Sequence, residues 1–460
     1  MHNMQSNPSA GAATRRDFIK KTATAAAAVA ATGLLKTPVY GQTTAPSANV
    51  AGANNRLAIG VIGLGNQGLN SHLVKLVELN NQNNTVIGAV CDLSKFRLNR
   101  AFQAAQNPDC KQYGDYRQLL EQKDLDCVFV ATQDHWHAKV GIDAVNAGKH
   151  AYVEKPMSRY LREAFELYDA VKKTGKIVQI GSQGCSDLKW HKAAEVIKKG
   201  TIGPLIMSQG SYMRNTVKGE WNYPIDPANT AEDVNWDTWL GPVKTKKAFD
   251  ADDFFRWRKY YRYCAGLLGD LFPHKLHPYM LATGNPEFPT RVAAIGTRKV
   301  LTDKNTPGTP LRDSPEILQL IADFPSGLTM HMCSSSVNEQ GVLEMIRGQK
   351  GSLYMGGNKV ELKPEKPFSE DFDPESFGPF ESETFAAHHK NFFESIRANK
   401  QPNCNVDLAT RVQTVVCLGE MANRTSTMVL FDEKTRKCTD ASGKELTPFD
   451  YGIGEESAKV

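Results

Sequence analysis

The stretch RLAIGVIGLGNQG, residues 56–68, decides the fold of this chain. Its apolar run predicts a buried strand, and its glycines predict a tight turn that begins a helix. Such glycines let backbone N–H groups approach a pyrophosphate, and the helix N-terminus adds its positive end. A glycine-rich turn without a ligand is the alternative. The predicted dinucleotide-binding turn consists of Gly63, Gly65, Asn66, Gln67 and Gly68.

Outward from this turn, strands and helices alternate as far as residue 182. The later predicted strands are TVIGAVCD, DCVFVAT, HAYVEKP and KIVQIGS. Strand, helix and strand in series, with continuous apolar strands, predict a parallel sheet covered by helices on both faces. Residues 56–182 are therefore predicted to form a Rossmann domain.

An acidic residue ends the second predicted strand. Asp92 lies 24 residues beyond Gly68, where a carboxylate accepts hydrogen bonds from the ribose hydroxyls of the adenosine half. It would also repel a 2′-phosphate, so the position favours NAD over NADP. Lys95 and Arg97 follow closely and weaken this preference.

The ends of the next strands supply further candidate cofactor contacts, because parallel sheets bind ligands at the carboxyl ends of their strands. Thr132, Asp134 and His137 follow one strand, and Glu154 and Lys155 end the next. Pro156 restricts Lys155 to extended backbone, which directs the lysine into the cleft. These side chains are predicted to lie along the nicotinamide half.

The second half of the chain has a different pattern. Its strand-like runs follow one another with short turns, which predicts a largely antiparallel sheet. Two helical patterns, FAAHHKNFFESIRANK and DLATRVQTVVCLGEMANRT, come near the end. The fold class is therefore α/β, with a Rossmann domain followed by an α/β domain over residues 183–460 that carries a large open sheet.

GVIGLGNQG, Asp92 and AGKHAYVEKP resemble the Gfo/Idh/MocA family, which includes relatives of glucose-fructose oxidoreductase and inositol dehydrogenase. The resemblance implies NAD as cofactor, a carbohydrate substrate, and an open sheet that often packs subunits into a homo-oligomer. The family's catalytic lysine corresponds to Lys155, and its catalytic aspartate and histidine correspond to Asp270 and His274. His277 stands where many members have an acidic residue.

Asp270 and His274 also suit these roles by their chemistry. On one helix, residues four apart share a face. Histidine takes up a proton near neutral pH, and a neighbouring carboxylate orients its ring. A helix-surface ion pair is the alternative for such a pair.

Aromatic and arginine side chains are concentrated between Ser211 and Tyr263, where four of the six tryptophans lie. Aromatic faces stack on the C–H faces of a sugar, and arginines bind its hydroxyls. Packing of a long insertion is the alternative for each aromatic residue. The candidate substrate contacts are Tyr212, Arg258, Arg262, Tyr263 and His277.

The sequence therefore predicts an NAD-dependent oxidoreductase that acts on a secondary hydroxyl of a sugar, sugar derivative or cyclitol. One alternative is a glycosidase that oxidises its sugar transiently and eliminates the aglycone, although the glycosidase branch that resembles this chain has a tyrosine in place of Asp270. The second alternative is a sugar sensor that keeps the pocket without the chemistry.

The N-terminal sequence predicts export. Arg15 and Arg16 in TRRDFIKK precede a weakly apolar run, as in a twin-arginine signal peptide. We expect residues 1–41 to be this signal, residues 42–55 a flexible linker, and the mature protein periplasmic. Because this route carries folded proteins, the enzyme would leave the cell with its cofactor bound.

The remaining composition excludes several classes. Loss of residues 1–41 leaves 50 basic and 49 acidic side chains of the original 55 and 50, without a basic stripe for nucleic acid. No later apolar run is long enough to span a membrane. The nine cysteines are scattered singly, which predicts reduced core thiols and neither a metal site nor a disulfide framework.

Overall fold

The computed structural model describes residues 55–456, so the predicted signal and nearly all of the predicted linker lie outside the described residues. All the elements below belong to one compact unit, Leu57–Val460.

The first sheet has six parallel strands in the order β3-β2-β1-β4-β5-β6. This is the order of a doubly wound dinucleotide-binding sheet. The short strand β3 was not predicted, because its three residues are half-buried or exposed. The strands are β1 (Leu57–Ile62), β2 (Thr85–Cys91), β3 (Lys111–Tyr113), β4 (Cys127–Val130), β5 (His150–Glu154) and β6 (Val178–Gly181).

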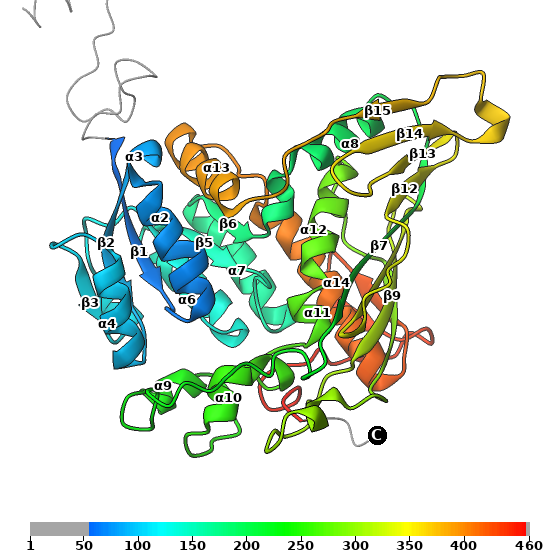
Figure 1. Ribbon diagram of the computed structural model, residues 1–460. Coiled ribbons are helices and arrows are strands. Elements are labelled where there is room, and N and C mark those ends of the chain that lie inside the picture. Colours follow the sequence, from blue (N-terminus) through cyan, green and yellow to red (C-terminus); the bar gives the residue numbers. More distant parts are fainter. Residues whose placement is uncertain (1–54, 457–460) are drawn as a thin grey trace, which may run out of the picture. The chain divides into compact units, whose positions relative to one another are not determined.

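Helices cover both faces of this sheet, as predicted (Figure 1). Alternate strand residues point to opposite faces: Ile59 and Phe129 pack on one side, Ile62 and Val128 on the other. The first face is covered by the π-helix η2 (Gln67–Leu73), α2 (Val74–Glu78), α4 (Lys95–Ala104) and α13 (Phe385–Ala398). The second face is covered by α5 (Tyr116–Leu120), α6 (Asp134–Asn146) and α7 (Leu161–Thr174).

Helix α13 comes from far along the chain, yet it completes the core of the first sheet. Phe392 and Phe393 are fully buried and contact Phe129 of β4, with ring centroids 5.7 and 6.0 Å apart. A backbone bridge also joins Gln179 of β6 to Asn405. Packing therefore crosses the predicted boundary at residue 182, and that boundary itself stays a prediction.

The second sheet is large and mostly antiparallel, and only β7 and β10 run parallel in it. Its main path is β15-β14-β13-β12-β7-β10-β9-β8-β16-β17-β18, and β11 pairs with β7. The strands are β7 (Leu205–Asn215), β8 (Arg291–Thr297), β9 (Ile317–Asp323), β10 (Thr329–Ser335), β11 (Val337–Asn338), β12 (Met345–Gly348), β13 (Gly351–Tyr354), β14 (Val360–Pro364), β15 (Glu375–Phe377), β16 (Val429–Asp432), β17 (Lys437–Thr439) and β18 (Glu445–Leu446).

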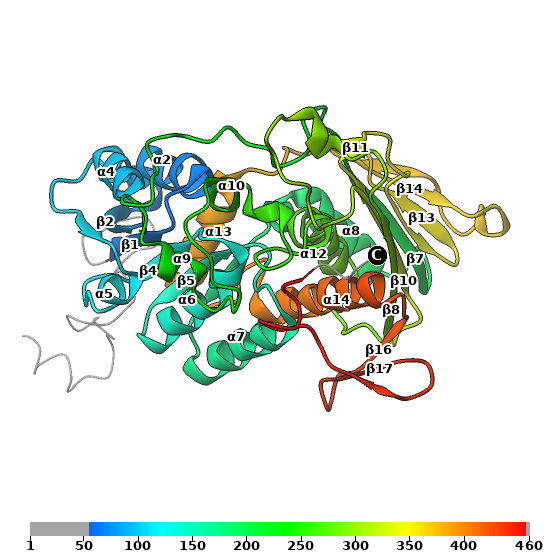
Figure 2. The ribbon, with the colours of Figure 1, turned by 90° about the horizontal axis from the view of Figure 1, so that it is seen from below.

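Three helices pack on one face of this sheet, α8 (Leu188–Lys198), α12 (Pro273–Ala282) and α14 (Val406–Thr425) (Figure 2). Helix α12 approaches β7 closely because the strand has a glycine there: a Cβ on Gly210 would lie 2.6 Å from the ring of Tyr279. The smaller elements are α3 (Asn80–Asn83), η3 (Gln183–Ser186), α9 (Trp236–Leu240), α10 (Ala251–Arg256), η4 (Trp257–Lys259), α11 (Leu267–Asp270), η5 (Thr302–Asn305) and η6 (Lys366–Phe368).

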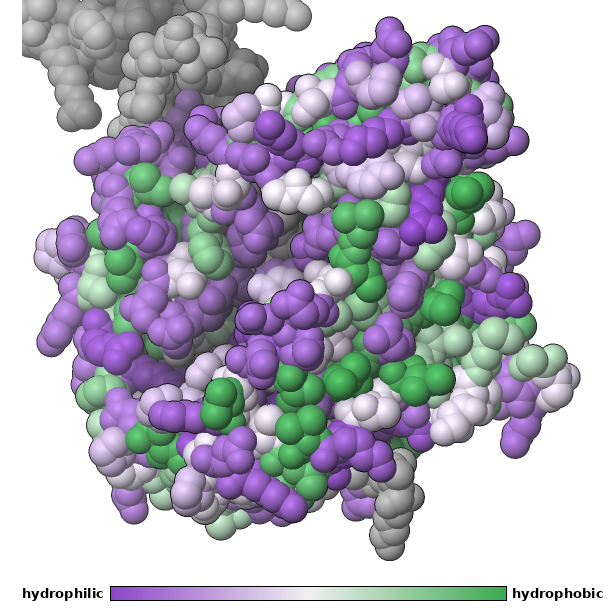
Figure 3. All heavy atoms as spheres, turned by 45° about the vertical axis from the view of Figure 1, so that its right-hand side comes forward, coloured by the Kyte–Doolittle hydropathy of each residue, from purple (hydrophilic) through white to green (hydrophobic). Residues whose placement is uncertain are grey.

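The opposite face of the large sheet is exposed. Ile206, Ile295 and Ile321 lie on β7, β8 and β9 with 51, 73 and 49% of their surface accessible. Figure 3 shows apolar residues among polar ones on the side of the molecule that it brings forward. All nine cysteines are buried and none is in a disulfide, as predicted.

A buried ion pair ties the segment after β5 to α14. Arg159 donates to both carboxylate oxygens of Glu420, at 2.6 and 2.8 Å, and both side chains are almost fully buried. We expect Glu420→Ala to lower the free energy of unfolding by about 3–5 kcal/mol, because it leaves the Arg159 charge buried without its partner. Urea unfolding measures this loss. The control is Glu78→Ala, which breaks an exposed pair with Lys75 and should cost about 0.5 kcal/mol or less; an equal loss in both variants would contradict the prediction.

Candidate functional site

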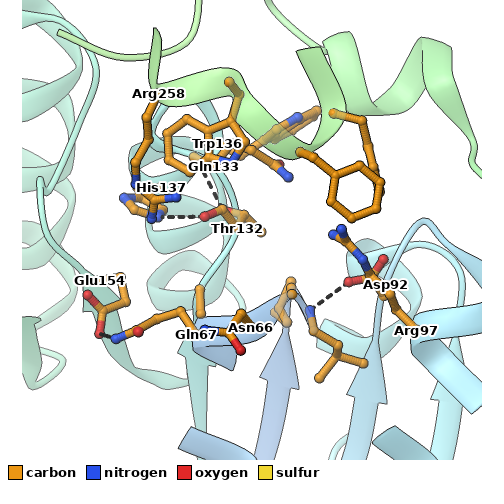
Figure 4. A pocket seen from close by; sticks show the side chains of 18 of the residues that line it. Asn66, Gln67, Asp92, Arg97, Thr132, Gln133, Trp136, His137, Glu154 and Arg258 are labelled. Carbon is orange, nitrogen blue, oxygen red and sulfur yellow. Dashed lines mark hydrogen bonds between the residues drawn. The ribbon is translucent and has the colours of Figure 1, made fainter. Parts of the chain in front are cut away.

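A cavity of about 630 Å³ opens at the carboxyl ends of the strands of the first sheet and reaches to β7 and α12. Asp92 and Glu154 lie at opposite ends of the part of the cavity that Figure 4 shows, with Gln67 and Thr132 between them. This is where a doubly wound sheet binds its ligand.

The glycine turn forms one wall of the cavity. Gly63 has a φ of +86°, and a Cβ there would lie 2.7 Å from the backbone of Ala131. A Cβ on Gly68 would lie 1.8 Å from the carbonyl oxygen of Gly63, so Gly68 closes the turn from behind and does not line the cavity. The helix that follows begins as a π-helix at Gln67, not as an α-helix. Gly63, Gly65, Asn66 and Gln67 line the cavity.

Asp92 closes the end of the cavity next to β2. Its carboxylate accepts hydrogen bonds from Leu64 N at 2.6 Å and Ser94 N at 2.8 Å, so it also holds the glycine turn against β2. Burial raises the pKa of Asp92, and the charge of Arg97 opposes this rise. The Arg97 guanidinium lies 4.2 Å from the ring centre of Phe254. Backbone, carboxylate and guanidinium groups thus surround the space for a ribose.

A segment from the second half of the chain, residues 221–240, crosses this end of the cavity, and we call it the strap. Ser94 Oγ donates to Asp233 Oδ2 at 2.5 Å, and Phe96 N donates to Asp233 Oδ1 at 2.8 Å. Asn235 N donates to Leu93 O at 3.0 Å. The strap lines the cavity with Tyr223, Pro224, Asp226, Asn229, Thr238 and Trp239. Nothing in the sequence pattern pointed to these long-range bonds.

The residues after β4 form the opposite wall. Thr132 and His137, two of the predicted cofactor contacts, line the cavity together with Gln133 and Trp136. Both ring nitrogens of His137 bond to carbonyl oxygens, of Pro156 at 2.8 Å and of Thr132 at 3.1 Å, so its ring braces this wall. Asp134 is the buried first residue of α6 and lies outside the lining.

Lys155 and Asp270 meet in the floor of the cavity. Lys155 Nζ donates to Asp270 Oδ1 at 2.9 Å and to its carbonyl oxygen at 2.8 Å. Arg258 Nε also donates to Oδ1, at 3.0 Å, and Trp221 Nε1 donates to Oδ2, at 2.9 Å. Burial alone would raise the pKa of Asp270, but the charges of Lys155 and Arg258 hold it well below its usual range. Asp270 is therefore a fixed anion.

Trp221 reaches Asp270 from an unusual backbone conformation. Its φ of +66° is rare for a bulky residue, and such conformations cluster at functional sites. The side chain is 1% exposed. The strained backbone at Trp221 thus places the indole against the carboxylate, and no sequence pattern indicated this contact.

His274 faces the same cavity, but not on the helix face predicted from its spacing. Asp270 is the last residue of α11, and His274 lies in the first turn of α12, because Pro273 lacks the N–H that would continue the helix. The ring of His274 stacks on Tyr212, with centroids 5.2 Å apart, and the described hydrogen bonds of the Asp270 side chain go to Lys155, Arg258 and Trp221. Tyr212, not Asp270, orients the imidazole. Burial, with Lys155 second, lowers its pKa to about 3.

The predicted substrate contacts divide into two groups. Tyr212 and Arg258 line the cavity, whereas Arg262, Tyr263 and His277 do not. Tyr263 is buried and donates to Asp253 at 2.7 Å, and His277 is buried against the carbonyl of Pro273 at 2.8 Å. For Trp236 and Tyr263 the packing interpretation holds, because both belong to a separate core cluster and neither lines the cavity. Other members of the aromatic and arginine-rich segment also line the cavity, namely Arg214, Tyr223, Phe254, Phe255 and Trp257, and Gln183 is a lining residue that the sequence analysis missed.

The cavity fits a dinucleotide by its own features. A pyrophosphate needs the Cβ-free turn at Gly63 and Gly65, a ribose needs the acceptor at Asp92, and both are present in one continuous cavity. Among residues 55–456, no group of three histidine, cysteine or acidic side chains is placed to hold a metal ion. No helix in that range is long and apolar enough to cross a membrane.

The fold and the cavity define the class as an NAD-binding Rossmann protein. Residues 57–182 match the family model described as "Oxidoreductase family, NAD-binding Rossmann fold". This part of the chain is similar to the NAD-binding domain of the Gfo/Idh/MocA oxidoreductases, and NAD is the cofactor that the domain binds.

The chain is also similar to two curated relatives and to a solved structure. An inositol 2-dehydrogenase of Salmonella typhimurium is 31% identical over 173 residues, 36% of this chain and 49% of the relative. A glycosyl hydrolase family 109 protein of Shewanella baltica is 28% identical over 217 residues, 43% of this chain and 46% of the relative. The matches thus span about half the length of these curated relatives. The crystal structure of an aldose-aldose oxidoreductase from Caulobacter crescentus has the same fold, with a TM-score of 0.61 at 18% identity, over 82% of this chain and all of that one.

Proposed function

We propose that this protein is an NAD-dependent oxidoreductase that interconverts a secondary hydroxyl and a ketone of a sugar, sugar derivative or cyclitol. One observation carries the proposal: Lys155, Asp270 and His274 line the same cavity as the glycine turn and Asp92. The 31% identical relative is an inositol 2-dehydrogenase, which supports a polyhydroxylated substrate.

The bound NAD supplies the hydride acceptor. His274 is the base that takes the hydroxyl proton. Lys155 Nζ uses two of its three protons on Asp270 and has one left to donate to the reacting oxygen, whose developing negative charge it stabilises. Asp270 fixes the lysine in this direction, and Arg258 and Tyr212 lie where they can contact other hydroxyls.

A panel of sugars and cyclitols tests this function, with NADH formation and ketone formation measured in parallel. Equal amounts of both, or of ketone and a reduced second carbonyl compound, support the proposal. Binding of a sugar without hydride exchange to C4-deuterated cofactor would replace it with a sensor.

A glycosidase outcome is the second candidate, favoured by the family 109 relative. Transient oxidation, elimination and return of the hydride would use the same cavity. Aryl glycosides decide between the two: release of the aglycone without net NADH is the result that favours the glycosidase.

The pH dependence follows from His274. Its lowered pKa, about 3 against an ordinary 6.5, means that the neutral base is lost only below that pH. We therefore expect kcat/KM to show no acid limb near pH 6.5 and to stay level down to about pH 5. Enzyme incubated at each pH and assayed at pH 7 controls for denaturation. A reversible limb with an apparent pKa near 6.5 would contradict the prediction.

We further propose that the protein is exported by the twin-arginine route to the periplasm, on the strength of TRRDFIKK. We also propose a homo-oligomer that buries the exposed face of the large sheet, where Ile206, Ile295 and Ile321 lie.

A further inference from the structure

A buried chain of three side chains ends at the cavity. Glu154 Oε1 bonds to His72 Nε2 at 2.8 Å, and His72 Nδ1 bonds to His389 Nε2 at 3.0 Å. The side chains come from β5, η2 and α13, and His72 and His389 have no accessible surface. Only Glu154 reaches the cavity, where Gln67 Nε2 also donates to its Oε1 at 3.2 Å.

The hydrogen bonds assign the protons along this chain. An ionised Glu154 can only accept, so His72 Nε2 carries a proton. In a neutral His72 the other nitrogen, Nδ1, is then an acceptor and takes the proton of His389 Nε2. This leaves His389 Nδ1 as a bare acceptor, and it is a buried atom without a hydrogen-bond partner among the described residues.

Aromatic rings enclose this hydrogen-bonded chain. His72 lies among the rings of Phe129, Tyr152 and Phe385, with centroids 5.7, 5.3 and 5.6 Å away. Burial lowers the pKa of His389 well below its usual range, so His389 is a neutral donor to His72. Against burial, the hydrogen bonds from His72 and Gln67 and the charge of Lys155 lower the pKa of Glu154. The negative charge of this hydrogen-bonded series of side chains is therefore on Glu154.

This charge lies at the end of the cavity opposite Asp92 (Figure 4). Because Asp92 marks the adenosine half, Glu154 lies on the nicotinamide side. Nearby, Lys155 and Arg258 carry two positive charges and Asp270 one negative charge, so Glu154 brings the sum to zero. Without it, a net positive charge would face the nicotinamide ring. That ring is positive in NAD⁺ and neutral in NADH, so the carboxylate distinguishes the two forms.

We propose that His72 and His389 are positioning residues that keep Glu154 ionised beside the nicotinamide, and that this charge sets the relative affinity of the site for NAD⁺ and NADH. The inference rests on NAD binding alone and not on any sugar activity. The proposal gives helix α13 a role at the cavity, although α13 lies more than 200 residues further along the chain than Glu154.

The test measures how the protein partitions between the two nucleotides. The full chain is equilibrated with an excess of mixed NAD⁺ and NADH, free nucleotide is removed by rapid gel filtration, and the bound nucleotides are released by denaturation and quantified. Glu154→Gln keeps the shape and removes the charge. We expect the bound ratio to shift at least about tenfold towards NADH, because the loss of one unit charge several ångströms from the ring, at a protein-like dielectric constant, changes the affinity for the cationic form by at least that factor.

His389 variants test the positioning role. His389→Phe removes the donor to His72, so we expect a shift of about threefold in the same direction. His389→Gln has an amide that can donate from the same place, and the ratio should stay close to that of the unchanged protein. A Glu154→Gln ratio within about twofold of the original would overturn the proposal. If His389→Phe binds both nucleotides more weakly but the ratio of bound NAD⁺ to NADH is unchanged, His389 does not have the proposed positioning role. Because no sugar is used, either failure leaves the proposed activity untouched.

Discussion

Replacement of Lys155 or His274 by alanine is expected to lower turnover by about 10²- to 10⁴-fold while NAD stays bound. His274→Ala removes the proton acceptor of the cavity. Lys155→Ala removes the donor to the reacting oxygen and also leaves Asp270 with only Arg258 and Trp221 as partners. Neither side chain belongs to the glycine turn or to the Asp92 end of the cavity, so nucleotide binding should persist.

Steady-state turnover on the best sugar of the panel, together with quantification of released NAD, measures both parts of this prediction. Matched controls are Lys275→Ala, which removes a lysine paired with Glu344 outside the cavity, and His331→Ala, which removes a histidine from β10. Both should turn over within about twofold of the unchanged enzyme. Near-normal rates from Lys155→Ala or His274→Ala would remove the proposed mechanism.

The second large effect concerns retention of the cofactor. If the protein is exported as proposed, it meets little free NAD and must keep the molecule with which it folded. Retention through purification of micromolar protein requires a dissociation constant of about nanomolar or below, roughly −12 kcal/mol. The strap supports such affinity, since it closes the Asp92 end of the cavity with bonds to Ser94 and Phe96. We expect the exported form, purified without added nucleotide and then denatured, to release close to one NAD per chain.

Asp233→Ala tests the strap directly. It removes two hydrogen bonds to a carboxylate, and we expect NAD to dissociate at least about tenfold faster. Asp237→Ala, on the exposed side of α9, is the control and should release NAD at the original rate. An empty exported protein with micromolar affinity would show that cofactor retention is the wrong explanation for the signal.

Local patterns carried most of what could be predicted. The alternation around residues 56–182, the spacing of the glycines and the position of Asp92 follow from short-range rules, and the structure has the predicted sheet and turn. The strap and the indole of Trp221 could not be predicted, because their partners lie 139 and 49 residues away along the chain. Composition also could not separate Tyr263, buried on Asp253, from Tyr212, which faces the cavity. The prediction of one helix through Asp270 and His274 was wrong, because Pro273 interrupts it.

Helix α13 has a consequence for the order of events in the cell. Phe392 and Phe393 fill the core beneath β4, and their helix is followed by only α14, β16, β17 and β18 among the described elements. While the ribosome is still translating this region, the growing chain has an unfinished sheet with Phe129 and Tyr152 uncovered. A chain truncated before residue 385 would lack the two phenyl rings that pack on Phe129 and Tyr152, so it would expose an aromatic surface of the kind that makes unfinished chains prone to aggregation.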